Sequence, residues 1–250
     1  MKKVLGVSVF TLVAACLIAP KFIANEYQTK LADFVQNIDS EAGYTATLES
    51  TQTRWFGSTS TLLVSFDTSL ITPTAEPQTI TAEFLLDTHF GPLLFNKQKL
   101  VGLFATEVQL QGKQQRQYLN WNEQTPLYNL SVTSGLTGDL EFDDYIPAFT
   151  NKAQTLSVSE YQGHGQYNTD KLIYNGSFKA ATSTERTSVT AQNVSLNLDL
   201  DANWETLRSE GFYNGAMSLN IDKLTTLPQG EFDGISVTLN TKLDDKTQLG

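Results

Sequence analysis

Residues 194–201 read VSLNLDLD, in which every second side chain is apolar and every intervening one is polar. This period of two is typical of a β-strand with one apolar face and one face in water. The same alternation recurs at residues 217–222 and 235–240, and more weakly in earlier segments. We therefore expect a mainly β fold, in which residues 43–250 form an elongated, curled antiparallel sheet, either a groove or a sandwich. Its apolar face must be covered by a second sheet, by curling, or by a lipid-like ligand.

Composition limits the classes of function. With 250 residues, 40% of them hydrophobic, the chain can bury one sizeable core or two modest ones. The formal net charge of −10, without any Lys/Arg cluster, predicts no nucleic-acid partner. The single cysteine, Cys16, excludes a disulfide framework and a thiolate metal site in the folded portion. We also expect no cofactor.

The N-terminal segment predicts a membrane anchor. Lys2 and Lys3 precede a largely apolar stretch at residues 4–24, which as a helix would rise about 31 Å, close to the thickness of a bilayer's hydrocarbon core. The leading lysines favour an N-terminus in the cytoplasm. We expect residues 1–24 to be a signal anchor that crosses a bacterial inner membrane once, with the bulk of the chain in the periplasm.

Two other interpretations of this segment stay open. The sequence VAAC at residues 13–16 matches the pattern that precedes a lipidated cysteine, although Leu17 and Ile18 continue the apolar run where a polar tether normally begins. A cleaved signal peptide would end after Ala19, where Pro20 hinders cleavage. The three interpretations differ in what holds the protein to the membrane.

Residues 25–42 predict a short amphipathic helix, which ends at Gly43. Apolar side chains there recur at steps of three and four, namely Tyr27, Leu31, Phe34, Val35 and Ile38. We expect this juxtamembrane helix to pack on the sheet, and the alternative is a helix that dimerises.

The rest of the chain is predicted to be one β-rich domain with a break near residue 145. Residues 142–152, which include Pro147, read as helical or irregular. The polar ending TKLDDKTQLG follows the last strand without a closing element, and is compatible with a shortened family member or a fragment.

Large aromatic residues occupy a corner within TRWFGSTSTLLVSF, residues 53–66. We expect Gly57 and Ser58 to supply a two-residue reversal between a strand that starts at Tyr44 and a strand at 59–66. Trp55 and Phe56 would then lie at the hairpin tip. They would either cap the end of the sheet or rest at a membrane interface.

A family resemblance rests on the following residues. The anchor and the amphipathic helix are followed by the corner Arg54-Trp55-Phe56-Gly57-Ser58 and the turn His89-Phe90-Gly91-Pro92. Over roughly residues 1–110 this order resembles the bacterial YdgA-like family, a domain of unknown function in Gram-negative envelopes. Its members show an Arg-Gly-Trp-Phe-Ser-Ser-like corner and a His-Gly-Pro turn, whereas this chain lacks the glycine after Arg54 and inserts Phe90. The resemblance implies an inner-membrane-anchored periplasmic β protein, distantly similar to AsmA-like envelope proteins, with no known activity.

Catalytic motifs are nearly absent, so we expect no enzyme. The chain has no Gly-x-Ser-x-Gly, P-loop, His-Glu-x-x-His or Rossmann glycine pattern. Of its two histidines, His89 is expected to end a strand at a turn, with a general base as the alternative, and His164 to face solvent from a strand.

One acidic spacing is similar to a calcium loop. Asp199, Asp201, Asn203, Glu205 and Glu210 fall at positions 1, 3, 5, 7 and 12 of that template. Trp204 occupies the position where the template needs glycine. We interpret the segment as an acidic strand end and expect no metal.

Two functional hypotheses remain. In the first, the protein is a non-enzymatic envelope scaffold whose strand edges and acidic face meet other envelope proteins or a second copy of the chain. In the second, the apolar face of the sheet shields acyl chains or another apolar ligand. The hypotheses differ in whether inward residues such as Leu196, Leu198, Leu219 and Val237 are closely covered by protein.

Overall fold

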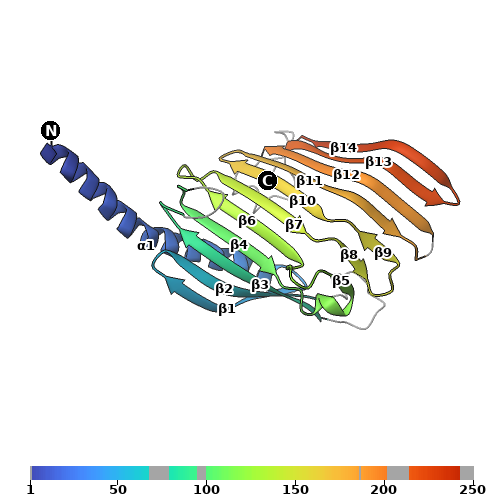
Figure 1. Ribbon diagram of the computed structural model, residues 1–250, viewed down its shortest axis with the longest axis horizontal. Helices are drawn as coiled ribbons and strands as arrows, with labels where there is room; N and C mark the ends of the chain where they lie inside the picture. Colours follow the sequence, from blue (N-terminus) through green and yellow to red (C-terminus); the bar gives the residue numbers. More distant parts are fainter. Residues whose placement is uncertain (1, 68–78, 95–99, 186, 202–213, 243–250) are drawn as a thin grey trace, which may run out of the picture. The chain divides into compact units, whose positions relative to one another are not determined.

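The computed structural model describes residues 2–67, 79–94, 100–185, 187–201 and 214–242. Within them the chain forms one α-helix, a short 3-10 helix and fourteen β-strands (Figure 1). The paired strands run antiparallel, and the strand order does not close on itself. The prediction of a mainly β, antiparallel fold is therefore confirmed.

The chain divides into two compact units, which we call the N-terminal unit (residues 1–114 and 131–137) and the C-terminal unit (115–130 and 138–250). Residue 145, where the sequence suggested a break, lies inside strand β7. The N-terminal unit contains α1 (Lys2–Ser40), β1 (Tyr44–Arg54), β2 (Gly57–Asp67), β3 (Thr79–Phe90) and β4 (Phe104–Leu110). Strand β6 (Tyr128–Ser134) contributes residues to both units.

The C-terminal unit carries the longest strands. Strands β7, β10, β11, β12, β13 and β14 pair antiparallel in this order. Three short strands lie off this path, with β5 paired to β8, β8 to β9 and β9 to β11. The bounds are η2 (Gln115–Gln117), β5 (Leu119–Trp121), β7 (Leu140–Ile146), β8 (Phe149–Asn151), β9 (Leu156–Val158), β10 (Tyr161–Asn168), β11 (Lys171–Ser183), β12 (Ser188–Asp201), β13 (Asn214–Leu227) and β14 (Gly230–Thr241).

Residues 142–152 are not helical, contrary to the expectation from their sequence. They contribute to β7 and β8, and β7 pairs along its whole length with β10. Alternation was obscured here because Asp144 occupies a position on the apolar side, between Phe142 and Ile146. Partner strands, rather than local pattern, therefore fix this segment as strand.

A single helix, α1, replaces the two helical segments that the sequence distinguished at residues 1–24 and 25–42. It continues through Pro20 and ends at Ser40, and Gly43 (φ +83°) makes the turn into β1. A proline costs a helix one backbone hydrogen bond and bends it, and it need not end the helix when the flanking segments both favour helix. Within the part of the chain that the structure describes, no helix combines the length and the apolar character needed to span a membrane.

The second half of α1 covers the apolar face of the N-terminal unit's sheet (Figure 1). Leu31, Val35 and Ile38 pack on a cluster that includes Leu62 and Leu86. The sequence predicted this helix face and its packing on the sheet. Phe34, also predicted in that face, is instead 49% exposed, because the stripe that touches a flat sheet is narrower than all five apolar positions together.

A polar contact holds the same helix in place one turn earlier. The hydroxyls of Thr88 and Thr106 donate hydrogen bonds to the Tyr27 hydroxyl oxygen, at 3.0 and 3.2 Å. The Tyr27 ring packs against Phe90 and Phe104, with centroids 5.6 and 5.3 Å away. Tyr27 thus satisfies two buried hydroxyls while its ring fills the apolar layer, which fixes the register of α1 on the sheet.

Two neighbouring leucines of β3 allow a matched test of this core. Leu86 is 5% exposed beneath the helix, whereas Leu85 on the opposite face is 37% exposed. We expect Leu86→Ala to lower the free energy of unfolding by about 2–5 kcal/mol, because it removes buried surface and leaves a cavity. Leu85→Ala should cost less than about 1 kcal/mol. Urea unfolding followed by circular dichroism measures both, and equal losses would contradict the packing described here.

Candidate functional site: an open apolar sheet face

Strand register gathers apolar side chains on one face of the C-terminal unit. Residues that are directly paired on neighbouring antiparallel strands share a face of the sheet. The pairs place Leu196 beside Leu219 and Leu219 beside Val237, and the next row is offset by two residues along each strand. From β11 to β14 this face carries Leu172, Tyr174, Phe178, Val194, Leu196, Leu198, Leu200, Met217, Leu219, Ile221, Ile235, Val237 and Leu239.

This surface, which we call the apolar face, is open to solvent. Leu219 is 36% exposed and Val237 is 58% exposed, and Met217 and Leu239 are exposed as well. The polar residues of β13 that alternate with them, Ser218 and Asn220, lie on the opposite face of the sheet and are half-buried. Leu196 and Leu198 are half-buried rather than buried. Among the described residues, β13 and β14 therefore leave apolar side chains of this face in water, and an exposed apolar surface of this kind is a candidate interaction site.

Glycines form a floor on the β10 and β11 side of the same face. Gly163, Gly165 and Gly176 are buried, and they lie in register with Asp144, Phe142 and Leu196 of the adjoining strands. A Cβ atom at Gly165 would collide with the Phe142 ring, and one at Gly176 would collide with the Tyr161 ring and hydroxyl. The absent side chains therefore leave the room in which the aromatic rings lie flat on the sheet.

A polar cluster sits above this floor. The Tyr174 hydroxyl donates to the Asp144 carboxylate, 3.0 Å from Oδ1 and 3.2 Å from Oδ2, and it also hydrogen-bonds with the Tyr161 hydroxyl. The Tyr174 ring stacks on Phe142, with centroids 5.9 Å apart and an interplanar angle of 10°. Within the described residues no Lys, Arg or His pairs with Asp144. The apolar face thus contains a carboxylate that is bound by tyrosine and not neutralised by a cation.

Burial determines the electrostatics of this cluster. Desolvation is the largest cause that raises the pKa of Asp144, and the hydrogen bond from Tyr174 opposes it. Burial, with the charge of Asp144 as the next cause, raises the pKa of Tyr128 to about 12. The pKa of Tyr174 is raised by burial and then by its hydrogen bonds with Tyr161 and Asp144. A negative charge on Asp144 is therefore poorly compensated by its surroundings.

The two sequence motifs of the family resemblance meet in the N-terminal unit. Gly57 pairs with His89, and the Phe90 backbone N–H donates to the Phe56 carbonyl at 2.9 Å. Arg54 Nη2 donates to Asp87 Oδ1 at 3.2 Å, and His89 Nε2 lies 3.9 Å from the other oxygen of that carboxylate. These charged groups are all about half exposed or more. The turn continues through a cis Gly91–Pro92 peptide bond, and Ser58 is buried.

The hairpin turn itself consists of the aromatic residues. Arg54 pairs directly with Gly57, so Trp55 and Phe56 are the two turn residues and lie at the tip, as expected. The expectation that Gly57 and Ser58 form the reversal is wrong. Gly57 begins β2, and a Cβ there would collide with the Thr88 carbonyl oxygen. The glycine is needed for close approach of β3 rather than for the turn.

Trp55 also contacts the helix. Its indole N–H donates to the Leu17 carbonyl at 2.8 Å, although the ring stays 55% exposed. Leu17, whose carbonyl accepts this bond, lies in the turn of α1 that precedes Pro20. The corner therefore holds the hairpin to α1 at its proline.

The remaining candidate residues do not assemble a catalytic or metal site in the described chain. His164 is exposed on β10, with Nδ1 2.7 Å from Asp143 Oδ1, on the face opposite Asp144. Asp199 forms an ion pair with Lys171 at 2.9 Å, whereas Asn203, Glu205 and Glu210 lie outside the described residues. No group of three or more potential metal ligands occurs among the residues that were placed. Cys16 is a half-buried free thiol in α1.

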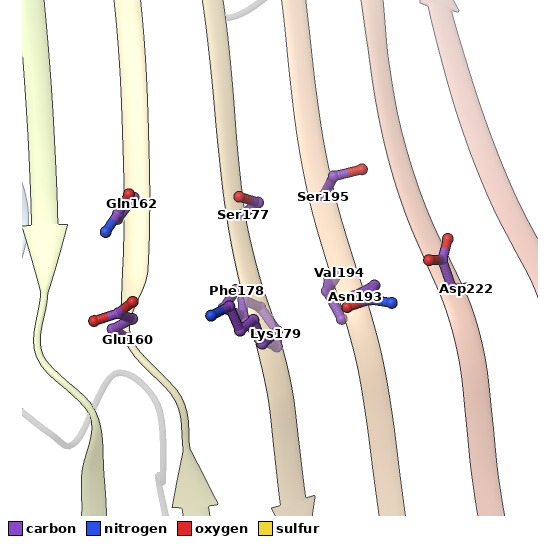
Figure 2. Close-up of a pocket in the computed structure, with 9 residues that line it drawn as sticks. All are labelled: Glu160, Gln162, Ser177, Phe178, Lys179, Asn193, Val194, Ser195 and Asp222. Carbon is purple, nitrogen blue, oxygen red and sulfur yellow. The ribbon is translucent and has the colours of Figure 1, made fainter.

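A shallow hollow of about 490 Å³ lies across strands β10 to β13 (Figure 2). Its lining includes Ser177 and Ser195 but no histidine that could activate either hydroxyl, and no cysteine. The full lining is Glu160, Gln162, Ser177, Phe178, Lys179, Asn193, Val194, Ser195 and Asp222.

Comparison with known proteins gives a family and no activity. An open antiparallel sheet with a helix on one part and an exposed apolar face on another defines the architecture. A family model described as a bacterial protein of unknown function (DUF945) matches residues 1–250, and the chain belongs to this family. No curated protein and no solved structure matches it.

Sequence reasoning missed the polar cluster on the apolar face. Tyr161, Gly163, Gly165 and Tyr167 alternate in one strand, which is a visible signal of rings lying over a glycine floor. Asp144 carried no such signal, because its place on the apolar side follows only from the register of β7 with β10.

The raised pKa of Asp144 predicts a pH-dependent loss of stability. The folded protein holds the proton more tightly than the unfolded chain, so this contribution is present below the ordinary value of 3.8 and is lost as pH rises through the raised pKa. Asp144→Asn cannot titrate. We therefore expect the variant to gain stability relative to the wild type as pH increases from about 3.8 to neutral, as measured by urea unfolding at each pH.

Asp170→Asn, in the turn between β10 and β11, controls for a general change in net charge. A stability difference between Asp144→Asn and the wild type that is constant with pH would contradict the cause assigned to the shift.

Proposed function

We propose that this protein is held at the bacterial inner membrane, with its bulk in the periplasm, and binds the acyl chains of a lipid on the apolar face of its C-terminal unit. The role is binding, without catalysis. One observation supports it above all, namely that Leu219, Val237 and their neighbours are exposed rather than sealed in a core. Of the two hypotheses that the sequence left open, this is the one that an uncovered apolar face favours.

The hydrophobic effect gives the physical reason. Each Å² of apolar surface removed from water contributes about 25 cal/mol, so a row of exposed leucines, isoleucines and valines favours an apolar ligand strongly. Lipid chains suit such a surface because their binding needs no hydrogen bonds and no exact register. On the apolar face, the segment of β12 from Val194 to Leu198 carries no charged side chain. The segment of β13 from Met217 to Ile221 carries none on that face either.

Membrane attachment is supported by the sequence at the N-terminus. Residues 4–24 are almost continuously apolar and follow two lysines. The exposed Trp55 at the hairpin tip lies against Leu17 in the same helix, and tryptophan is favoured at membrane interfaces. The motif residues 54–58 and 89–92 support membership of the YdgA-like envelope group within the wider family.

A scaffold role is the second candidate, and a different observation favours it. Strand β14 ends the strand order of the C-terminal unit and pairs only with β13 among the described residues. An unpaired strand of this length is a template for another strand. Its partner would be another envelope protein, or a second copy of the chain in a homodimer.

Photocrosslinking in intact cells tests lipid binding on the full chain. Cells grown with a diazirine-labelled fatty acid incorporate it into their lipids, and adducts are mapped by peptide mass spectrometry after irradiation. We expect adducts on peptides that contain Leu196, Leu219 and Val237. The variant Leu219→Asn/Val237→Asn should reduce their yield about tenfold, because each substitution places an amide on the apolar face.

Ser218→Asn/Thr238→Asn is the matched control. Ser218 and Thr238 pair with each other, and each is adjacent in sequence to Leu219 or Val237. Their side chains therefore lie on the opposite face of the same two strands. Their substitution should leave the adduct yield within about twofold of wild type. Adducts confined to residues 4–24, with none on β12 to β14, would refute lipid binding by the sheet while leaving membrane attachment in place.

Protease accessibility combined with intact mass tests the anchor. We expect protease added to spheroplasts to digest the sheet, and the purified protein to retain residues 1–24 without modification. A diacylglyceryl increment on Cys16 would establish the lipoprotein interpretation instead, and a mass that lacks the first residues would establish cleavage. Recovery of the undigested protein in the cytosolic fraction would contradict the proposed location.

A further inference from the structure

We infer that the Asp144 cluster recognises the ammonium group of the lipid bound by the apolar face, so that the preferred ligand is a lipid with an amine-bearing headgroup. This inference rests on the proposed function and specifies its ligand. The cluster consists of Asp144, Phe142, Tyr128, Tyr161 and Tyr174.

The first step is the unbalanced charge. Asp144 is a half-buried carboxylate on a face that is otherwise apolar and aromatic, and among the described residues Tyr174 is the side chain that donates hydrogen bonds to its oxygens. A carboxylate offers about four lone-pair positions. The single Tyr174 hydroxyl approaches both oxygens, so the group retains acceptor capacity. A cation placed there would remove an electrostatic cost that the folded protein otherwise bears.

The second step is the aromatic surround. The Tyr174 ring stacks on the Phe142 ring, and the Tyr161 hydroxyl forms a hydrogen bond with the Tyr174 hydroxyl. Aromatic faces attract cations, and a carboxylate combined with several rings is the arrangement that binds ammonium groups in proteins. Metal ions are poor candidates, because Asp144 belongs to no group of three or more potential metal ligands among the described residues. An ammonium group needs only one carboxylate and the rings.

The third step is continuity with the apolar face. Asp144 begins a row of paired residues that continues through Gly163, Gly176, Leu196, Leu219 and Val237. Neighbouring strands are about 4.8 Å apart, so Gly176 to Val237 spans about 14 Å. One leaflet of a bilayer has a hydrocarbon depth of about 15 Å. A lipid with its ammonium group at Asp144 could therefore extend an acyl chain past the Tyr161 ring, which covers Gly176, and onto β12 to β14.

The net charge of the whole chain also favours a lipid with an amine-bearing headgroup. A net charge of −10 disfavours lipids whose headgroups carry only negative charge.

Competition for photocrosslinking tests the inference on the full-length protein in amphipol. A photoreactive decyl probe is crosslinked to the C-terminal unit, and decyltrimethylammonium, decanol and decanoate are added as competitors that share a chain and differ in headgroup. We expect decyltrimethylammonium to compete about tenfold better than decanol, and decanoate to compete worst. In Asp144→Asn the preference for the cation over decanol should fall to within about threefold.

Asp143→Asn is the matched control, because it removes the adjacent carboxylate on the opposite face. It should retain the tenfold preference, and circular dichroism checks that both variants are folded. Equal competition by the cation and decanol in the wild type, or a preference that persists in Asp144→Asn, would overturn the inference and leave lipid binding standing. If no competitor reduces crosslinking, the proposed function fails, and the inference fails with it.

Lipid that co-purifies with the protein gives an independent readout. Mass spectrometry should show lipids with amine headgroups enriched over anionic lipids relative to the membrane extract, and this enrichment should be lost in Asp144→Asn. Enrichment of anionic lipids would contradict the inference directly.

Discussion

An antiparallel sheet with one apolar face gains stability in water when that face is covered, and the two units of the molecule differ in how far they meet this constraint. The N-terminal unit meets it with its own helix, since Leu31, Val35 and Ile38 of α1 seal the surface formed by Leu62, Leu86 and their neighbours. Tyr27 adds two hydrogen bonds from buried threonines at the same contact. The second half of α1 thereby becomes part of the core.

The C-terminal unit carries the same kind of face without such a helix among its described residues. Its strands are longer, and their hydrogen bonding to both neighbours compensates part of the stability that a covered face would add. The glycine floor lets Phe142, Tyr161 and Tyr174 lie on the sheet, so aromatic rings replace a covering layer over β10 and β11. On β13 and β14 the apolar residues Met217, Leu219, Val237 and Leu239 stay exposed. The most exposed part of the apolar face therefore lies on the last two strands of the strand order.

Sequence alone could predict the elements whose pattern is strong and local. The alternation at residues 194–201, 217–222 and 235–240 lies within β12, β13 and β14, and the stripe of Leu31, Val35 and Ile38 does face the sheet. Features that depend on which strands pair, and in which register, could not be predicted from the sequence. Asp144 interrupts the alternation of β7, so that strand was missed, and so was its polar cluster with Tyr174 of β11. The turn residues at the corner were displaced by two positions, because glycine at 57 suggested a reversal when its role is close approach to Thr88.

The corner motif connects the helix to the sheet of the N-terminal unit. The Leu17 carbonyl, in the turn of α1 that precedes Pro20, accepts the indole N–H of Trp55 and so attaches the β1–β2 hairpin to the helix. Arg54 beside Trp55 binds Asp87 of β3 near the same hairpin tip. The residues of the two sequence motifs thus have one architectural role, because together they fix the hairpin to the helix on one side and to β3 on the other.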